Sequence, residues 1–368
     1  MANKWLDPGE IYIIGEYEIG TSIPTGLYKI GMVQNESTSA GRLDTHQTGN
    51  PNRLFIARVI PTEATYLVEQ LIHSARETDR IALEWFRLPT PADVAQVESE
   101  IRALEALHGP RITGLRSVCY SAPNSGSRPG LSPADISNAE QLRDDAYDIC
   151  KEMMELKYTS ETLKFQILLA NGIDASVDCV TKVKVEAPYT EFADTLLPPA
   201  LRTQYMTKQR KRKDDFRFVF TANTGKICDL KTTTRWWKDM YPTEEAAYTI
   251  AKQQWETMES TITPATVNTV VQPRTAAIES LHTEYTRQCA EYDALGDRKK
   301  TIEIQLKLLC YDYEEISNVC QWKRGTQTNK FNILEFKINE NAAYILPAHQ
   351  APKGDKVTLS VIKYKAWS

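Results

Sequence analysis

The feature that most constrains the fold of this chain is a series of short sequence blocks between Ile11 and Leu88. The first two, IYIIG and GLYKIGM, are rich in β-branched and aromatic residues, and a loop with glycine, serine and proline separates them. They predict two strands and a connecting loop. Three further blocks follow, GRLDTHQTGNP, LVEQLIH and EWFRL, and the apolar residues around LVEQLIH recur at helical spacing. This region therefore predicts a small sheet beside an amphipathic helix.

In order and spacing the five blocks resemble the GIY-YIG nuclease superfamily, specifically the branch common in phages and bacteria that ends in Glu-Trp-Phe. One departure is Ile11, which stands where the family name implies a glycine. The resemblance implies a metal-dependent DNA endonuclease that hydrolyses phosphodiester bonds with Mg²⁺ or Mn²⁺. The family's helical glutamate, which holds the cation, is matched by Glu69. One carboxylate suits a hard cation that keeps several waters and binds a substrate phosphate.

The resemblance also implies roles for residues in the first three blocks. Tyr12 and Tyr28 match the two motif tyrosines, one of which would orient or deprotonate the attacking water, and the sequence does not decide which. Arg42 matches the arginine that contacts the scissile phosphate. A guanidinium suits this role because it stays charged and binds oxygen atoms as a fork. His46 would assist the general base, and Lys29 is a further candidate to contact phosphate or DNA.

Each of these residues also has an ordinary structural interpretation. The two tyrosines can be strand aromatics, Glu69 and His73 can form a weak surface pair one helical turn apart, and Arg42 and His46 can be solvated loop residues. Glu84 either supports the site from behind or merely precedes two aromatic residues that close the core. Tyrosine, arginine and glutamate occurring together favour an enzyme. The alternatives are a catalytically impaired fold that binds DNA without cutting it, and a regulatory interaction module.

Composition limits what the rest of the chain can be. With 368 residues, 42% of them hydrophobic, the chain can bury two or three cores at the usual size of about 100 to 200 residues per domain. No run approaches the roughly 20 apolar residues of a membrane span, and the first residues lack the apolar core of a signal peptide. The sequence therefore predicts a cytoplasmic protein without membrane contact. Seven scattered cysteines without CxxC spacing favour reduced thiols over structural zinc.

The net charge of −4 does not indicate a nucleic-acid binder, but binding depends on where the cations lie. The densest cationic cluster is KQRKRK, Lys208 to Lys213. It is either an exposed loop or helix end, or a patch that contacts DNA phosphates. In the second case Arg210, Lys211, Arg212 and Lys213 are the DNA-binding residues.

The sequence as a whole predicts an α+β protein with several domains. The expected order is a GIY-YIG domain at 1–118 with a small antiparallel sheet flanked by helices, a linker at 119–136, an α+β domain of unknown role at 137–272, and a C-terminal region at 273–368. The last helix of the first domain is expected to end at Gly109-Pro110, and a stretch rich in serine, proline and glycine indicates the linker. The later domains would select DNA or mediate assembly.

The C-terminal region begins with apolar residues at three- and four-residue spacing. They predict a long helix, or a helical hairpin bent near Gly296, followed by short strands. A heptad-like helix is commonly a packing or dimerisation surface, so a homodimer through residues 275–310 is possible on this pattern.

This C-terminal part also resembles, weakly, the phage YqaJ-type recombination exonucleases. Those enzymes use an Asp followed by Glu-x-Lys, in which two carboxylates bind the metal. Here Asp178 matches the first carboxylate, but the triplet reads Lys184-Val185-Glu186, with its charges reversed. The pattern predicts either coincidence or an inactive core kept for DNA binding.

Overall fold

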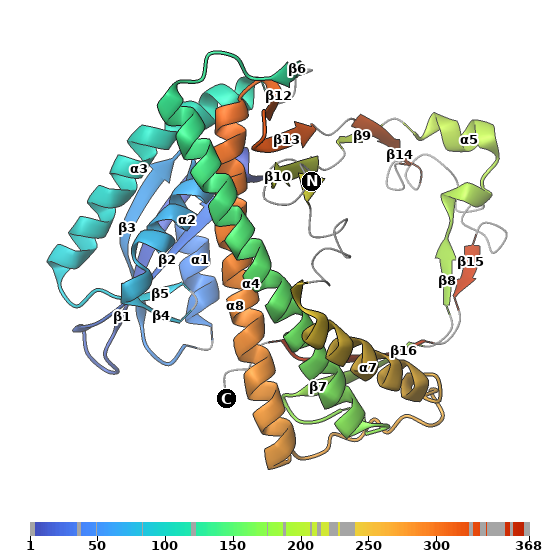
Figure 1. Ribbon diagram of the computed structural model, residues 1–368. Coiled ribbons are helices and arrows are strands. Elements are labelled where there is room, and N and C mark those ends of the chain that lie inside the picture. Colours follow the sequence, from blue (N-terminus) through green and yellow to red (C-terminus); the bar gives the residue numbers. More distant parts are fainter. Residues whose placement is uncertain are drawn as a thin grey trace. The chain divides into compact units, whose positions relative to one another are not determined.

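The computed structural model describes most of the chain. The described residues are 4–34, 38–48, 50–82, 84–118, 123–174, 176–186, 189–206, 208–211, 215–220, 227–228, 240–323, 327–331, 336, 350–353 and 356–363. This part is mixed α and β and begins with an antiparallel sheet (Figure 1), so the predicted α+β class is confirmed at that level.

The chain forms two compact units, and neither is continuous in sequence. The first unit comprises Met1–Ala146, Lys213–Cys228 and Asp297–Gly325, and the second comprises Tyr147–Arg212, Asp229–Gly296 and Thr326–Ser368. The first unit thus extends beyond the predicted 1–118 domain, because strands and a helix half from much later in the chain complete it.

The N-terminal sheet of the first unit has five strands in the order β3-β1-β2-β5-β4, all neighbours antiparallel. Its elements are η1 (Lys4–Leu6), β1 (Gly9–Tyr17), β2 (Pro24–Gln34), β3 (Leu54–Thr62), β4 (Arg80–Ala82) and β5 (Trp85–Arg87). The interior strand β1 is buried from Ile11 to Glu16 without alternation. Such continuous burial requires that both faces of the sheet be covered.

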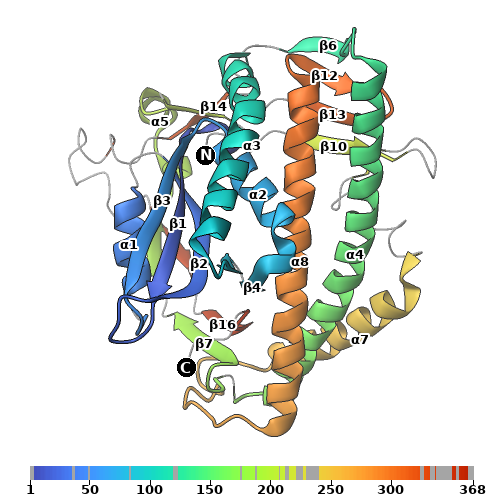
Figure 2. The ribbon, with the colours of Figure 1, turned by 90° about the vertical axis from the view of Figure 1, so that its left-hand side faces the viewer.

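Helices cover both faces of this sheet, with α1 on one side and α2 and α3 on the other (Figure 2). Their bounds are Ser39–Gln47 for α1, Thr65–Ala75 for α2 and Pro91–Val118 for α3. The predicted end of α3 at Gly109-Pro110 is wrong, since the helix continues through Pro110. Proline inside a helix costs about 3 kcal/mol. Fully buried Ile112 and Leu115 lie beyond it, and their packing offsets that cost.

A second sheet of the first unit is assembled from distant segments in the order β11-β10-β13-β12-β6. Its strands are β6 (Asn124–Ser127), β10 (Asp215–Val219), β11 (Ile227–Cys228), β12 (Tyr313–Ile316) and β13 (Cys320–Lys323). Because β6 pairs in parallel with β12, the described part of the predicted linker 119–136 is ordered structure. Behind the sheet, the buried Lys307 Nζ lies 5.3 to 5.5 Å from the ring centroids of Trp5, Phe216 and Trp322.

Two long helices, α4 (Pro133–Asn171) and α8 (Ala276–Cys310), contribute residues to both units. The region from 276 is therefore one continuous helix, without a hairpin at Gly296. Its apolar stripe packs within the chain. Buried members of the stripe are Ile278, Tyr285, Leu295, Ile302, Leu306 and Leu309. The stripe predicted as a dimerisation surface thus already has partners in its own chain.

The second unit combines the other halves of α4 and α8 with short strands in two-stranded pairs. Its remaining elements are β7 (Thr181–Glu186), β8 (Tyr189–Phe192), η3 (Asp194–Leu196), α5 (Pro199–Gln204), β9 (Lys208–Lys211), α7 (Pro242–Glu259), β14 (Gln327–Lys330), β15 (Gln350–Lys353) and β16 (Lys356–Val361). The pairs are β14-β9, β15-β8 and β16-β7. Phe165, Leu168 and Trp255 form one of its apolar clusters.

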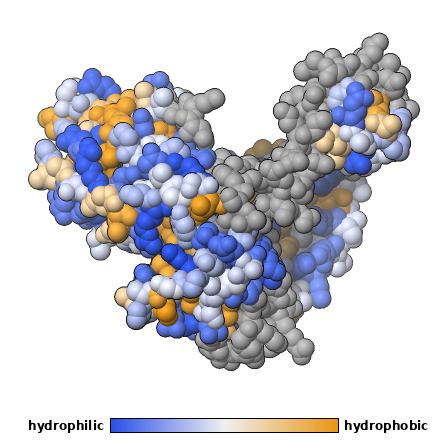
Figure 3. Space-filling model, turned by 90° about the horizontal axis from the view of Figure 1, so that it is seen from above, coloured by the Kyte–Doolittle hydropathy of each residue, from blue (hydrophilic) through white to orange (hydrophobic). Residues whose placement is uncertain are grey.

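On the face shown in Figure 3, the described hydrophobic residues are interspersed with hydrophilic ones. Large aliphatic side chains that are exposed include Ile19 and Ile23 of the β1–β2 loop. None of the helices in the described ranges has the length and apolarity needed to cross a membrane.

Candidate functional site

The two motif tyrosines each lie across a glycine of the neighbouring strand. In the register of β1 with β2, Tyr12 is opposite Gly31 and Tyr28 is opposite Gly15. A Cβ atom added at Gly31 would come within 2.5 Å of the Tyr12 hydroxyl oxygen, and one at Gly15 within 2.6 Å of the Tyr28 ring. These contacts explain why glycine occupies both positions: any side chain there would displace a tyrosine ring.

The sheet separates the two tyrosines. Lys29 is opposite Ile14 in the register, so it shares the face of Tyr12. Because neighbouring residues of a strand point to opposite faces, Tyr28 is on the other face. There its ring meets the edge of Phe55, with 6.1 Å between the centroids. Of the two tyrosines that sequence alone leaves equivalent, only Tyr12 shares a face with Lys29.

On its face, Tyr12 contacts His46 of α1, with 3.3 Å between the tyrosine Oη and the histidine Nε2. Burial lowers the pKa of His46, and the charges of Lys29 and Arg42 lower it further. Burial raises the pKa of Tyr12, as does the charge of Glu84, whereas Arg42 opposes this rise. At neutral pH His46 is therefore uncharged and Tyr12 keeps its proton.

Arg42 and Glu84 complete the surroundings of this pair. Arg42 lies one helical turn before His46 on α1, and its side chain is exposed to solvent. Glu84 lies in the turn before β5 and accepts a hydrogen bond from Lys29 Nζ at 2.5 Å. Its backbone carbonyl accepts the Ile30 N–H at 3.0 Å. Glu84, whose role the sequence leaves open, is thus fixed beside β2 by both backbone and side chain.

Glu69 lies on α2 and is 5% exposed. Gln70 Nε2 donates to its Oε2 at 3.3 Å. Burial, followed by the negative charge of Glu84, raises the pKa of Glu69 to about 8, while the Gln70 hydrogen bond and the charge of Lys29 oppose the rise. A nearby cation stabilises the ionised form of such a carboxylate, because its positive charge offsets the cost of ionising a buried group.

His73, one turn after Glu69, does not form the surface pair that the helical spacing allows. It is buried, and its Nε2 lies 2.9 Å from the backbone oxygen of Ile30. Its ring packs on Phe86 with 5.2 Å between centroids. Burial is the main reason that its pKa falls to about 4. His73 therefore anchors α2 to β2 as a neutral side chain.

The donor set around Glu69 fits a hard divalent cation. Glu69 and Glu84 offer carboxylate oxygens, and Mg²⁺ is usually bound by one or two carboxylates together with waters and substrate phosphates. The described residues contain no group of three or more His, Cys, Asp or Glu side chains arranged to hold a metal ion. Any cation here would have few protein ligands and would take most of its coordination from water and phosphate.

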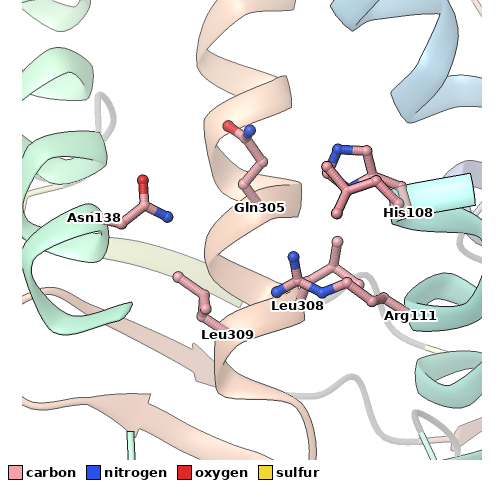
Figure 4. A pocket seen from close by; sticks show the side chains of 7 residues that line it. His108, Arg111, Asn138, Gln305, Leu308 and Leu309 are labelled. Carbon is pink, nitrogen blue, oxygen red and sulfur yellow. The ribbon is translucent and has the colours of Figure 1, made fainter. Parts of the chain in front are cut away.

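A separate cavity of about 240 Å³ lies among helices of the first unit (Figure 4). It is lined by Leu107, His108 and Arg111 of α3, Asn138 of α4, and Gln305, Leu308 and Leu309 of α8. None of the sequence-predicted site residues lines it. Its lining includes no carboxylate, so it does not compete with Glu69 as a cation site.

Several other residues singled out from the sequence belong to the second unit. Arg210 and Lys211 belong to β9, so their backbone is a strand rather than a loop or helix end, and Arg212 and Lys213 lie outside the described residues. Asp178 lies 3.8 Å from Arg274 in an ion pair.

On β7, Lys184 of the reversed triplet is ion-paired with Glu186, so the lysine and the carboxylate of the triplet contact each other.

No local sequence pattern indicates that α8 contributes to the surroundings of Glu69. Burial and the charge of Asp297 raise the pKa of Tyr66 on α2, and Asp297 also raises that of Glu69. Asp297 is more than 200 residues away along the chain, so only the tertiary structure reveals this proximity.

Comparison with known proteins adds no relative. No family model matches the chain, and no match was found among curated proteins or solved structures. Function is therefore inferred from the geometry of the site.

Proposed function

We propose that the protein is a metal-dependent DNA endonuclease with a GIY-YIG-type site on its N-terminal sheet. The observation that carries the proposal is the convergence of residues from separate sequence blocks. Tyr12 and His46 are in contact, Lys29 and Arg42 act electrostatically on His46, and Glu69 acts on Tyr12. Chance surface residues do not converge in this way on a buried tyrosine and a buried glutamate.

The proton of the attacking water would pass through Tyr12 to His46. With its own proton on Nδ1, neutral His46 accepts the Tyr12 O–H at Nε2, and the tyrosine oxygen takes a proton from water as it gives up its own. The raised pKa of Tyr12 argues against a free tyrosinate, and the lowered pKa of His46 keeps the acceptor uncharged at neutral pH. General base assistance of this kind contributes about 10²- to 10⁴-fold.

Positive groups on the same side would bind the phosphate. The exposed guanidinium of Arg42 would donate hydrogen bonds to the non-bridging phosphate oxygens, whose negative charge grows in the transition state. Glu69 would hold Mg²⁺ or Mn²⁺, which, when bound, supplies charge stabilisation to the phosphate oxygens. Tyr28, on the opposite face, is assigned a packing role and not a contact with substrate.

The test is cleavage of plasmid DNA by the full chain with Mg²⁺, with Mn²⁺ and with EDTA. We expect nicking that requires the cation and is abolished by Glu69→Gln, while gel-shift binding of DNA persists. Glu77→Gln is the matched control, because Glu77 is an exposed glutamate paired only with Arg80 at 3.3 Å. Wild-type protein that cuts no DNA with either cation, or a Glu69→Gln protein that cuts normally, would contradict the proposal.

A second candidate function is DNA binding without cleavage. It is favoured by the small donor set, since the described residues hold no group of three or more His, Cys, Asp or Glu side chains that could bind a metal ion. Binding in the gel shift together with no cleavage in either cation would select it. In both versions residues outside the N-terminal sheet choose the DNA.

A further inference from the structure

We propose that Glu84 is a second carboxylate ligand of the cation at Glu69, and that Lys29 neutralises Glu84 as an internal counter-ion until the cation displaces it. The inference rests on the cation site of the proposed function, but it does not depend on DNA being cut. It concerns how the chain keeps two carboxylates together before the cation arrives.

The backbone of Ile30 is hydrogen-bonded to both segments that carry the two carboxylates. Its N–H donates to the carbonyl oxygen of Glu84 at 3.0 Å, and its own carbonyl oxygen lies 2.9 Å from His73 Nε2. His73 is one turn after Glu69 on α2, and one turn spans about 5.4 Å. Ile30 is therefore hydrogen-bonded to Glu84 itself on the β5 side and, through His73, to the helix that carries Glu69, and the negative charge of Glu84 acts on Glu69.

The next residue of β2, Gly31, has no side chain. Gly31 follows Ile30, and the Tyr12 hydroxyl occupies the space that a Cβ there would need. Pairing of β2 with β5 covers only Leu27 to Lys29, so β5 does not continue alongside Gly31. A cation between Glu69 and Glu84 would thus lie next to the hydroxyl that is proposed to handle the water.

Lys29 has the properties of a displaceable counter-ion. Its side chain is 13% exposed and its Nζ is 2.5 Å from Glu84 Oε2, so the ammonium is largely withdrawn from solvent to neutralise this carboxylate. The four-carbon stem of lysine is flexible and its ammonium is a point charge without fixed directionality. When a divalent cation binds the Glu84 carboxylate, it displaces the Lys29 ammonium. The freed ammonium then lies on the face where the phosphate would bind.

The test measures Mn²⁺ binding by the full chain without DNA, using electron paramagnetic resonance of free Mn²⁺. We expect Glu84→Gln to weaken binding on the order of tenfold or more, because it replaces a charged oxygen ligand by a neutral one, and even changes around the ligands of a metal site cost about 10- to 100-fold in affinity. Lys29→Met should tighten binding by a similar factor, because it removes the competing ammonium. In the Glu84→Gln background Lys29→Met should have a much smaller effect, since the competition is for Glu84 and only the weaker influence of the Lys29 charge on Glu69 remains.

The matched controls are Glu161→Gln and Lys164→Met, a glutamate–lysine pair at 2.6 Å on α4 that should leave Mn²⁺ affinity unchanged. Unchanged affinity in Glu84→Gln, or weaker binding in Lys29→Met, would overturn the inference. If Glu84→Gln lowers thermal stability, Lys29→Met carries the test alone, because tighter binding cannot arise from partial unfolding. Mn²⁺ affinities that follow the expectation in a protein that cuts no DNA would overturn only the proposed function.

Discussion

The two faces of the N-terminal sheet carry equivalent motifs and have different chemistry. On each face a tyrosine lies over a glycine, and burial raises the pKa of both tyrosines. Tyr12, however, contacts His46 and is influenced by the charges of Arg42, Glu69 and Glu84, whereas the pKa of Tyr28 is raised by burial and by the neighbouring Tyr17 and lowered by the charge of Arg58. The motif therefore specifies how a tyrosine packs, and the groups near each hydroxyl decide whether it has reactive neighbours. For Tyr12 these groups come from α1 on its own face and also from α2, which covers the opposite face.

The strongest effect should come from substituting the two tyrosines separately. Tyr12→Phe should lower the single-turnover rate of DNA cleavage by about 10² or more, because it removes the hydroxyl that links water to His46. Tyr28→Phe keeps the ring over Gly15 and should change the rate by less than about tenfold. The measurement is cleavage at saturating enzyme with Mg²⁺. Equal losses in the two variants would show that the face does not decide the role.

A second prediction compares Arg42 with an arginine that packs on another tyrosine, Tyr17. Arg42→Ala should reduce the rate of cutting on the order of 100-fold, as removal of one transition-state donor does. The matched control is Arg53→Ala, whose guanidinium lies 4.5 Å from the ring centroid of Tyr17. The reduction should fall on kcat. If Arg42→Ala raised only KM, Arg42 would be a docking residue.

Sequence predicted the local parts of this site and missed the distant ones. Strand pairing and the helix that carries Glu69 follow from periodicity and from blocks a few residues long, whereas the helix α1 that carries Arg42 and His46 is not predicted. The location of Glu84 beside Lys29 depends on how β5 pairs with β2, and the acidic influence of Asp297 depends on where α8 packs. Such placements are set by tertiary contacts, which leave no periodic signal in the residues concerned.

The domain pattern shows the same limit. A glycine-proline pair predicts the end of a helix, yet α3 continues because the residues after Pro110 are buried. A stretch rich in small and turn-forming residues predicts a linker, yet β6 within it pairs with β12, which is nearly 190 residues later. Local propensity gives the free-energy cost of placing these residues in a helix or strand, but it contains no information about the long-range contacts that offset this cost.

A third prediction concerns His73 of α2, which packs on Phe86 of β5. Its folded pKa of about 4 lies below the ordinary 6.5, so the unfolded chain binds a proton between these values and the folded chain does not. Stability should therefore be complete above pH 6.5 and fall as the pH drops toward 4, by at most about 3 kcal/mol. Hydrogen exchange of α2 amides measures this loss. His73→Gln keeps a donor for the Ile30 carbonyl and should flatten the dependence, and an equally steep dependence in the variant would assign the acid sensitivity to other groups.

The weakest effect follows from how few cations the Tyr12 face offers. Lys29 is ion-paired with Glu84, and Arg42 is the exposed guanidinium of the proposed site. This face should therefore position a phosphate without supplying much of the affinity for DNA. We expect the KQRKRK segment to supply it. Replacing Arg210, Lys211, Arg212 and Lys213 with alanine should flatten the plot of log affinity against log salt by roughly one unit for each phosphate that the segment neutralises, because each neutralised phosphate releases counterions.

The control for that measurement is the cleavage rate at saturating enzyme, which the fourfold variant should retain because it leaves the Tyr12 face intact. Affinity would be followed by fluorescence anisotropy of labelled duplex DNA between low and physiological salt. A slope that stays the same would show that the segment is a solvated surface. The affinity would then have to come from elsewhere, beginning with Lys323, which follows the buried Trp322 on β13 and carries an exposed side chain.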